Sequence, residues 1–257
     1  MNQPAKDPTR RFSDRVENYA RYRPRYPQAV LHILQKETNF TPASVIADIG
    51  SGTGISAELF LENGNPVFAV EPNLEMRQAA ETKLQNNPQF HSIIGTAEAT
   101  TLPSQSVDYV VAAQAFHWFD LPQAKQEFAR ILKPGGWGVL MWNSRRTEST
   151  LFLRAYEALL QKYGTDYQSI RHKNIALKVL RTFFAAEQLE LRTLDNKQQF
   201  DFEGLKGRLL SSSYAPNEDH PNFKPMLHEL QRIFEQYAKQ GSVCFEYDTE
   251  VYFGRLT

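Results

Sequence analysis

The sequence predicts an α/β protein with a doubly wound, mostly parallel sheet, and two observations carry that prediction. Short apolar runs typical of buried strands alternate with segments of helical periodicity between residues 45 and 142. The first strand ends near Asp48, and the turn that follows has glycines at alternate positions, Gly50, Gly52 and Gly54. A strand, a glycine-rich loop and a helix in this order are typical of a nucleoside-binding α/β unit.

The elements of this first half follow from apolar periodicity and from the residues that interrupt it. Pro27 introduces the first helix, Asn73 is a plausible N-cap, and Gly64 and the turn at 133–136 end helices. The predicted helices are 28–36, 56–63, 73–84 and 123–132, and the predicted strands are 45–49, 67–70, 90–94, 107–112 and 137–142.

After Asn143 the pattern changes and helices dominate. The helices expected here are 151–163, 174–186, 202–210 and 223–240, and the strands are 189–200 and 242–252. The alternating apolar run of the last strand contains Cys244, which is therefore expected to be a sheet residue. The helices 202–210 and 223–240, together with residues 211–216, separate these two strands.

Composition and charge exclude several classes of function. The 257-residue chain has 29 Lys plus Arg and 29 Asp plus Glu, so no overall field favours nucleic acid or an anionic membrane, and neither partner is expected. Its single cysteine excludes disulfides and cysteine-based zinc sites, and no metal site is predicted. Residues 1–8 lack the apolar core of a signal peptide, and no run of about 18 apolar residues occurs, so a cytoplasmic location is expected.

The spacing of the glycines argues against a diphosphate ligand. A dinucleotide-binding loop has the form G-x-G-x-x-G, and Ile55 stands where its third glycine would be. A phosphate-binding loop of the G-x-x-x-x-G-K type is also absent, because no lysine follows Gly54 closely.

The loop resembles the first motif of the class I S-adenosylmethionine-dependent methyltransferases, which has the form acidic-x-G-x-G-x-G. Asp48, Gly50, Gly52 and Gly54 match it, with Ser51 inside the loop. The resemblance continues about 20 residues further on, where the family ends its second strand with an acidic residue that holds both ribose hydroxyls. In this chain that residue is Glu71, followed by Pro72. The resemblance implies S-adenosylmethionine as cofactor and a Rossmann-like sheet of seven strands, the last antiparallel, with a helical cap.

Two later segments resemble further motifs of this family. In the segment 95–103, Thr96, Ala97 and Glu98 are expected beside the adenine, although many members have an aspartate where Thr96 stands. In the segment 110–119, Gln114 and Ala115 are expected under the methionine part of the cofactor. His117 is the candidate catalytic residue, because imidazole accepts a proton near neutral pH. Equally, His117 and Trp118 together form part of the pocket wall.

An aromatic and basic cluster at 19–27 precedes the first predicted strand. It resembles N-terminal segments of small-molecule methyltransferases similar to trans-aconitate and quinone-biosynthesis methyltransferases, where the segment folds over the cofactor. This implies that the ring of Tyr19, Tyr22 or Tyr26 meets the positive charge of the cofactor, and that Arg23 pairs with a carboxylate of either the cofactor or the substrate. Tyr19 and Arg23 are the candidate cofactor-binding residues of this segment. The alternatives are a nucleic-acid patch, which the neutral chain disfavours, and exposed arginines on a fraying helix.

The sequence therefore predicts a methyltransferase that acts on a small-molecule acceptor by in-line displacement. The expected organisation is an N-terminal cap segment at 1–40, a cofactor-binding core at 41–145, and a remainder at 146–257 with the helical cap and the last two strands. Carboxylate, phenol and carbon acceptors all remain open, as does oligomeric state. The rivals are a non-catalytic S-adenosylmethionine-binding protein and a nucleotide-dependent oxidoreductase. Nucleic acid or protein methylation is disfavoured, because residues 113–116 lack the N/D-P-P-Y/F signature of many amino-group methyltransferases.

Overall fold

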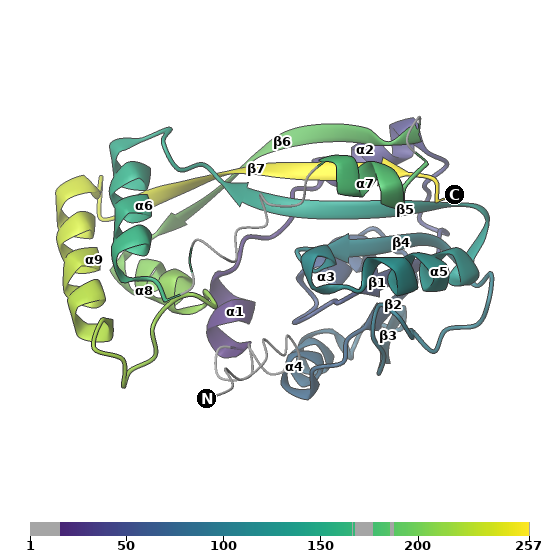
Figure 1. The fold of residues 1–257 in the computed structure, drawn as a ribbon, viewed down its shortest axis with the longest axis horizontal. Helices are drawn as coiled ribbons and strands as arrows, with labels where there is room; N and C mark the ends of the chain where they lie inside the picture. The colour runs from purple at the N-terminus through teal and green to yellow at the C-terminus, as the bar shows by residue number, and fades with distance from the viewer. Residues whose placement is uncertain (1–15, 166, 168–176, 186–187, 257) are drawn as a thin grey trace.

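A single mixed sheet organises the molecule. The computed structural model describes residues 16–165, 167, 177–185 and 188–256, and within them the seven strands lie in the order β3-β2-β1-β4-β5-β7-β6 (Figure 1). β1 to β5 pair in parallel, and β7 lies antiparallel between β5 and β6. The predicted mostly parallel, seven-stranded sheet is confirmed. The strands are β1 (Ile46–Ile49), β2 (Val67–Val70), β3 (Phe90–Ile93), β4 (Val107–Ala113), β5 (Leu132–Arg145), β6 (Glu190–Phe200) and β7 (Val243–Gly254).

The helices agree with the predicted ones apart from their ends and α1. Asn73 caps α4 as expected, because its side chain accepts from the Met76 amide at 2.8 Å. The helix predicted at 174–186 is described only as α7, since residues 174–176 and 186 lie outside the described part. The helices are α1 (Val16–Tyr22), α2 (Ala29–Glu37), α3 (Ile55–Glu62), α4 (Leu74–Leu84), α5 (Leu121–Ile131), α6 (Leu151–Tyr163), α7 (Leu177–Phe183), α8 (Phe202–Leu210) and α9 (Phe223–Tyr237).

Strand β5 differs from its prediction at the start. It begins at Leu132, which pairs with Val107, and the register then shifts before Trp137 pairs with Tyr109. The residues predicted as a turn, 133–136, are therefore part of an irregular strand. Gly135, with φ of +76°, supplies the backbone conformation that this irregularity requires.

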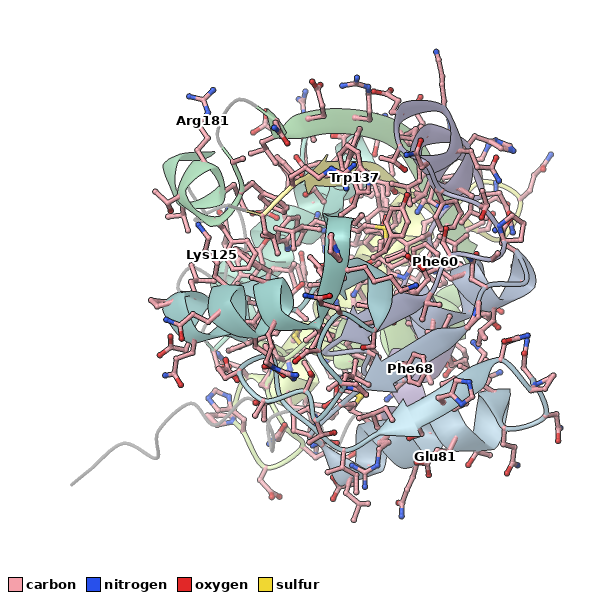
Figure 2. All side chains as sticks on the ribbon, turned by 90° about the vertical axis from the view of Figure 1, so that its right-hand side faces the viewer. Phe60, Phe68, Glu81, Lys125, Trp137 and Arg181 are labelled. Atoms are coloured by element: carbon pink, nitrogen blue, oxygen red, sulfur yellow. The ribbon has the colours of Figure 1, made fainter. Side chains whose placement is uncertain are left out.

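Helices cover both faces of the sheet because successive strand residues point to opposite sides. One face of the sheet packs against α2 and α3 in a cluster that contains Ile46 and Phe60. The other face packs against α5 and α7 in a cluster that contains Ala47 and Phe183. Figure 2 shows Arg181 of α7 pointing away from this core, so α7 is amphipathic. No helix among the described residues is long and apolar enough to span a bilayer.

A third apolar cluster lies at the far ends of β6 and β7. There α6, α8 and α9, which we call the cap helices, pack around Phe245 and Tyr247 of β7. Figure 1 shows the cap helices at one end of the molecule, separated from α3 and α5 by α1. The helical cap thus has a core of its own, built on strands that continue beyond the parallel sheet.

Residues 16–27, here called the strap, join the cap helices to the sheet. α1 packs against α8, where a Cβ on Gly207 would lie 2.0 Å from the Tyr22 ring. The amide of Asn143 on β5 donates to the Pro24 carbonyl at 3.3 Å, and Arg25 pairs with Glu58 of α3. The strap is therefore held by contacts to both parts of the fold.

Candidate functional site

The glycine loop after β1 lies at the carboxyl ends of the parallel strands. The structure shows why each of its three positions requires glycine. All three have positive φ, +67° at Gly50, +56° at Gly52 and +78° at Gly54. A Cβ on Gly50 would lie 2.7 Å from the Ala115 side chain, and one on Gly54 would lie 2.6 Å from the Leu84 side chain. A Cβ on Gly52 would meet no protein atom within 4 Å. Two glycines therefore permit close packing, and the third leaves open space.

Glu71 follows β2 and faces this loop. β1 and β2 pair in register, with Ile49 beside Val70, so the loop and the carboxylate leave the sheet side by side. The Glu71 carboxylate accepts from the Gly52 amide at 2.9 Å and from the Asn73 amide at 2.8 Å. Burial raises the pKa of Glu71, against the effect of these two bonds. A carboxylate has about four acceptor positions, so about two remain for a ligand.

A first hollow, with about 850 Å³ of empty volume including open solvent, lies between this loop and the next two strand ends. Ten of the predicted cofactor-binding residues line it. They are Tyr19, Gly50, Gly52, Glu71, Pro72, Thr96, Ala97, Glu98, Gln114 and Ala115. Trp118, the other candidate wall residue beside His117, also lines it, as do Asn73, Met76 and Phe119, which were not predicted. The first hollow thus gathers residues from five separate stretches of the sequence.

A second hollow, with about 480 Å³ of empty volume, lies on the other side of the glycine loop, under the strap. Two more predicted residues, Arg23 and Ser51, line it. It shares Tyr19 and Gln114 with the first hollow. Its wall also contains Tyr26 of the strap, one of the three candidate rings, and two residues that were not predicted, Asn143 of β5 and Arg208 of α8.

Three predicted residues line neither hollow: Asp48, Gly54 and His117. The Asp48 carboxylate is fully buried beneath the loop and accepts from the Ser56 hydroxyl at 2.6 Å. Its second oxygen has no hydrogen-bond partner, and burial raises the pKa of Asp48 to about 7. In this structure Asp48 holds the start of α3 under the loop.

His117 lies in a short 3-10 turn, Phe116–Trp118, that follows β4. Its ring packs against Trp118, with the ring centroids 4.7 Å apart. Because the neighbouring Trp118 lines the first hollow and His117 does not, the turn presents the indole to that space. A role for His117 as a base stays a prediction.

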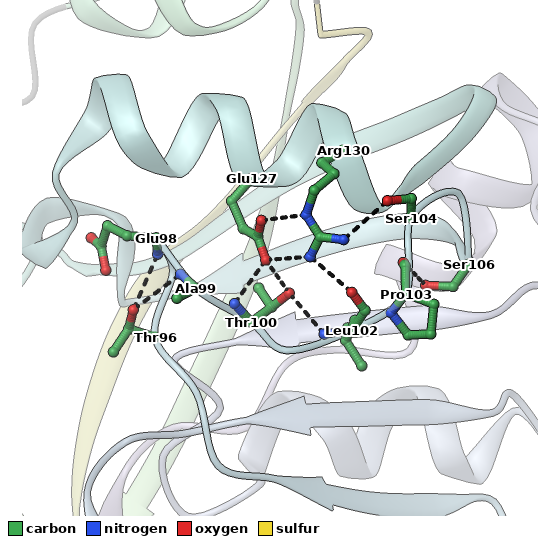
Figure 3. Close-up of polar contacts among 10 residues, drawn as sticks. All are labelled: Thr96, Glu98, Ala99, Thr100, Leu102, Pro103, Ser104, Ser106, Glu127 and Arg130. Atoms are coloured by element: carbon green, nitrogen blue, oxygen red, sulfur yellow. Dashed lines mark hydrogen bonds and ion pairs between the residues drawn. The ribbon is translucent and has the colours of Figure 1, made fainter.

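The loop after β3 is held against α5 by a pair of charged side chains (Figure 3). The Glu127 carboxylate accepts from the Thr100 amide at 2.8 Å and from the Thr100 hydroxyl at 2.5 Å. Arg130 pairs with Glu127 at 2.7 Å and donates to the Leu102 carbonyl at 2.8 Å. Upstream, the Thr96 hydroxyl accepts from backbone amides of the same loop. These bonds fix the loop that carries Thr96, Ala97 and Glu98 to the first hollow.

We expect Glu127→Gln to lower the free energy of unfolding by about 2 kcal/mol at pH 7. The hydrogen bond from Arg130, with those from Thr100, lowers the pKa of Glu127 from about 4.5 to about 2 despite burial. A carboxyl group whose pKa is lower in the folded state than in the unfolded state stabilises the fold at pH values above its unfolded pKa. For Glu127 this contribution is lost as the pH falls from about 4.5 toward 2. Denaturant unfolding at pH 7 and at pH 3 should therefore show the deficit shrinking in acid. Glu229→Gln, in an exposed pair with Arg232 on α9, is the control and should change little.

Comparison with known proteins decides the family. A model described as a methyltransferase domain matches residues 47–140. A protein of Schizosaccharomyces pombe, named as an uncharacterised methyltransferase, is 31% identical over 244 residues, 95% of this chain and 96% of that protein. The chain belongs to the class I S-adenosylmethionine-dependent methyltransferases.

Two further relatives of this methyltransferase define how far the likeness extends. A Mycobacterium tuberculosis protein, named as an uncharacterised methyltransferase, is 40% identical over 136 residues, 52% of this chain and 52% of that protein. The chain thus matches about half the length of that relative. A solved structure from Anaeromyxobacter dehalogenans, titled as a candidate type II methyltransferase, has 22% identity and a TM-score of 0.66, covering 91% of this chain and 98% of that one. It shares the fold.

The residues of this methyltransferase fit the cofactor that its family uses. Gly52 turns its side-chain-free Cα toward open space, so a ligand can approach the backbone there. Glu71 has acceptor positions left for two hydroxyl groups, as the resemblance implies for ribose. Within the described residues, no three His, Cys, Asp or Glu side chains are grouped as metal ligands.

Two residues of the second hollow were not predicted, although the sequence contains a weak indication of each. Asn143 follows a predicted strand at its carboxyl end, where ligands of open α/β sheets bind. Arg208 lies three residues after Leu205 on α8, so the helical repeat places a charge on the apolar face. Both residues are at most 5% exposed, and both line the second hollow.

Proposed function

We propose that this protein transfers the methyl group of S-adenosylmethionine to a small-molecule acceptor. The observation that carries the proposal is the pair of hollows on either side of the glycine loop, which share Tyr19, Gly50, Gly52 and Gln114. One hollow has the ribose-type acceptor Glu71. The other lies under the strap, on the far side of the same loop, where Arg23 and Arg208 line it.

The chain's own residues would bind and align the reactants. The donor's sulfonium would supply an already activated methyl group, so positioning and exclusion of water are the main needs. Glu71 and the Gly52 backbone would hold the adenosine, and Thr96, Ala97 and Glu98 would border the adenine. Tyr19 of the strap would close the space between the two reactants. An acceptor that is already ionised at neutral pH, such as a carboxylate, needs no residue of the second hollow to act as a base, and a phenol needs little help.

The proposal is tested in two steps on the full chain. Calorimetry should show binding of S-adenosylhomocysteine at 1:1 stoichiometry, and the methyl-labelled donor should label a compound of low mass in a metabolite extract. Binding without labelling would favour a non-catalytic binding protein. Tighter binding of a dinucleotide than of S-adenosylhomocysteine would favour an oxidoreductase.

A glycine pair separates ligand binding from folding. We expect Gly52→Ala to lower the affinity for S-adenosylhomocysteine about tenfold, because the new methyl group occupies the space left for the ligand. Its positive φ adds a cost of about 1 kcal/mol to stability. Gly54→Ala has the same backbone cost and also clashes with Leu84, so its melting temperature should fall further. Equal affinities for the wild type and Gly52→Ala would contradict the assignment.

A further inference from the structure

Two guanidinium groups face the second hollow without a carboxylate partner. Among the described residues, neither Arg23 nor Arg208 has a carboxylate within 4.0 Å, unlike the many paired arginines of the surface. Arg208 is 5% exposed, and its hydrogen bonds go to hydroxyl oxygens, at 3.2 Å to Tyr247 and 3.1 Å to Ser212. Arg23 donates to the Ser211 carbonyl at 2.9 Å, and its Nε is buried with no acceptor. Buried cations of this kind are costly unless an anion joins them.

A third arginine extends the cluster. Arg145 of β5 is paired with Glu157 at 2.5 Å and donates to Tyr167 at 3.0 Å, while its Nη1 is buried without an acceptor. The phenol of Tyr214 lies within the electrostatic reach of all three arginines. Burial raises the pKa of Tyr214, but Arg208, Arg145 and Arg23 together outweigh that effect and lower it. The three cations therefore act on one small volume.

The charges in this volume do not balance. Among the residues that the structure describes, Arg23, Arg145 and Arg208 are opposed by Glu157 alone, which leaves two of their positive charges uncompensated. S-adenosylmethionine brings one carboxylate, which can pair with one guanidinium, but its tail also has an ammonium and its sulfur a further positive charge, so it adds no net negative charge. The remaining candidate source of negative charge is the methyl acceptor.

We infer that the acceptor is an organic acid whose carboxylate is held by Arg23 and Arg208 in the second hollow. The inference rests on the proposed function, since it names the substrate class of the same site. A guanidinium donates two parallel N–H bonds to a carboxylate, and two guanidinium groups from different elements fix both its position and its plane. Arg208 comes from a cap helix and Arg23 from the strap, so the acid is bound only where these two segments meet.

Fractionation of the acceptor pool tests the charge of the acceptor directly. A metabolite extract is passed over an anion-exchange resin at pH 7, and each fraction is incubated with methyl-labelled donor and the full chain. We expect labelling from the bound and eluted fraction and at least tenfold less from the flow-through. Phosphatase treatment of the eluted fraction should leave the labelling unchanged. Labelling confined to the flow-through, or lost after phosphatase, overturns the inference. No labelling from either fraction, with S-adenosylhomocysteine still bound, overturns methyl transfer itself.

Variants of Arg208 assign the anion to the acceptor rather than to the cofactor tail. With the eluted acceptor, Arg208→Gln should raise KM about 10-fold to 100-fold, and Arg208→Lys should restore part of that loss. The Kd for S-adenosylhomocysteine, measured by calorimetry, should change less than about twofold. Arg232→Gln, on the exposed face of α9, is the matched control for loss of an arginine and should leave both values unchanged.

The same calorimetry excludes the cofactor as source of the anion. 5′-Methylthioadenosine lacks the amino acid tail. Substitution of a residue that holds the tail therefore weakens the binding of S-adenosylhomocysteine and leaves the binding of this probe unchanged. If Arg208→Gln weakens S-adenosylhomocysteine about tenfold and leaves 5′-methylthioadenosine unchanged, the anion is the cofactor's and the inference fails. An unaltered KM in an Arg208→Gln variant with a normal melting temperature also overturns it. If that variant does not fold, Arg208→Lys decides, because loss of the guanidinium fork alone should raise KM.

Discussion

Glu71→Ala should lower the affinity for S-adenosylhomocysteine by about 100-fold, a larger loss than the one expected for Gly52→Ala. The substitution removes the charged acceptor for two ribose hydroxyls. It also leaves the amides of Gly52 and Asn73 without the carboxylate that now orients them, so the loop loses its fixed position. Calorimetry at pH 7.5 measures the change, and affinity retained within twofold would contradict the assignment of this site.

Two companion variants separate charge from structure at this position. Glu71→Gln keeps one acceptor oxygen and should lose about tenfold in affinity. Glu75→Ala, on the exposed side of α4, is the control and should bind like the wild type. Because burial raises the pKa of Glu71, wild-type affinity should fall on acidification at a higher pH than an ordinary glutamate would dictate. Glu71→Gln should lack this dependence.

Gly207→Ala should lower turnover by about 100-fold, although the residue lies outside both hollows. A Cβ at this position would lie 2.0 Å from Cε2 of Tyr22 and 2.4 Å from its Cδ2, so the Tyr22 ring must shift, and we expect α1 to shift with it. Displacement of α1 moves Tyr19 and Arg23, which line the hollows, and a shift of about 1 Å in positioning groups is enough for such a loss. Labelled-methyl transfer measures turnover, and limited trypsin digestion after Arg21 and Arg25 reports release of the strap.

A compensating substitution makes this prediction specific. Tyr22→Ala removes the ring that the new methyl group would strike, so the double variant Tyr22→Ala/Gly207→Ala should recover at least part of the turnover. Lys206→Ala, the neighbouring position on α8, is the control for altered helix propensity and should be close to wild type. A double variant no better than Gly207→Ala alone would show that the damage lies elsewhere than at the strap.

The core of the site was predictable because its residues are close together in the sequence. Asp48 to Gly54 is one strand end and its turn, and Glu71 is the end of the next strand, so a local pattern places both at one edge of the sheet. The same logic predicted the order of helices and strands up to β5. It failed at residues 133–136, where pairing of Leu132 with Val107 extends the strand through residues typical of a turn.

The second hollow was not predictable in the same way. Arg23 and its partner Ser211 are 188 positions apart, and no periodicity within either segment indicates that they meet. Nor does the pattern around β4 decide which side chain of the short turn enters the first hollow, which proved to be Trp118 and not His117. Such contacts depend on how the cap helices pack on the long ends of β6 and β7, a tertiary property.

The shared ring of Tyr19 links the two halves of the site. It belongs to the wall of both hollows, so a rotation that enlarges one space narrows the other. We therefore expect occupancy on one side to alter the free energy of binding on the other, and by thermodynamic reciprocity the effect should be equal in both directions. Titrating either reactant in the presence of the other measures the sign and size of this coupling.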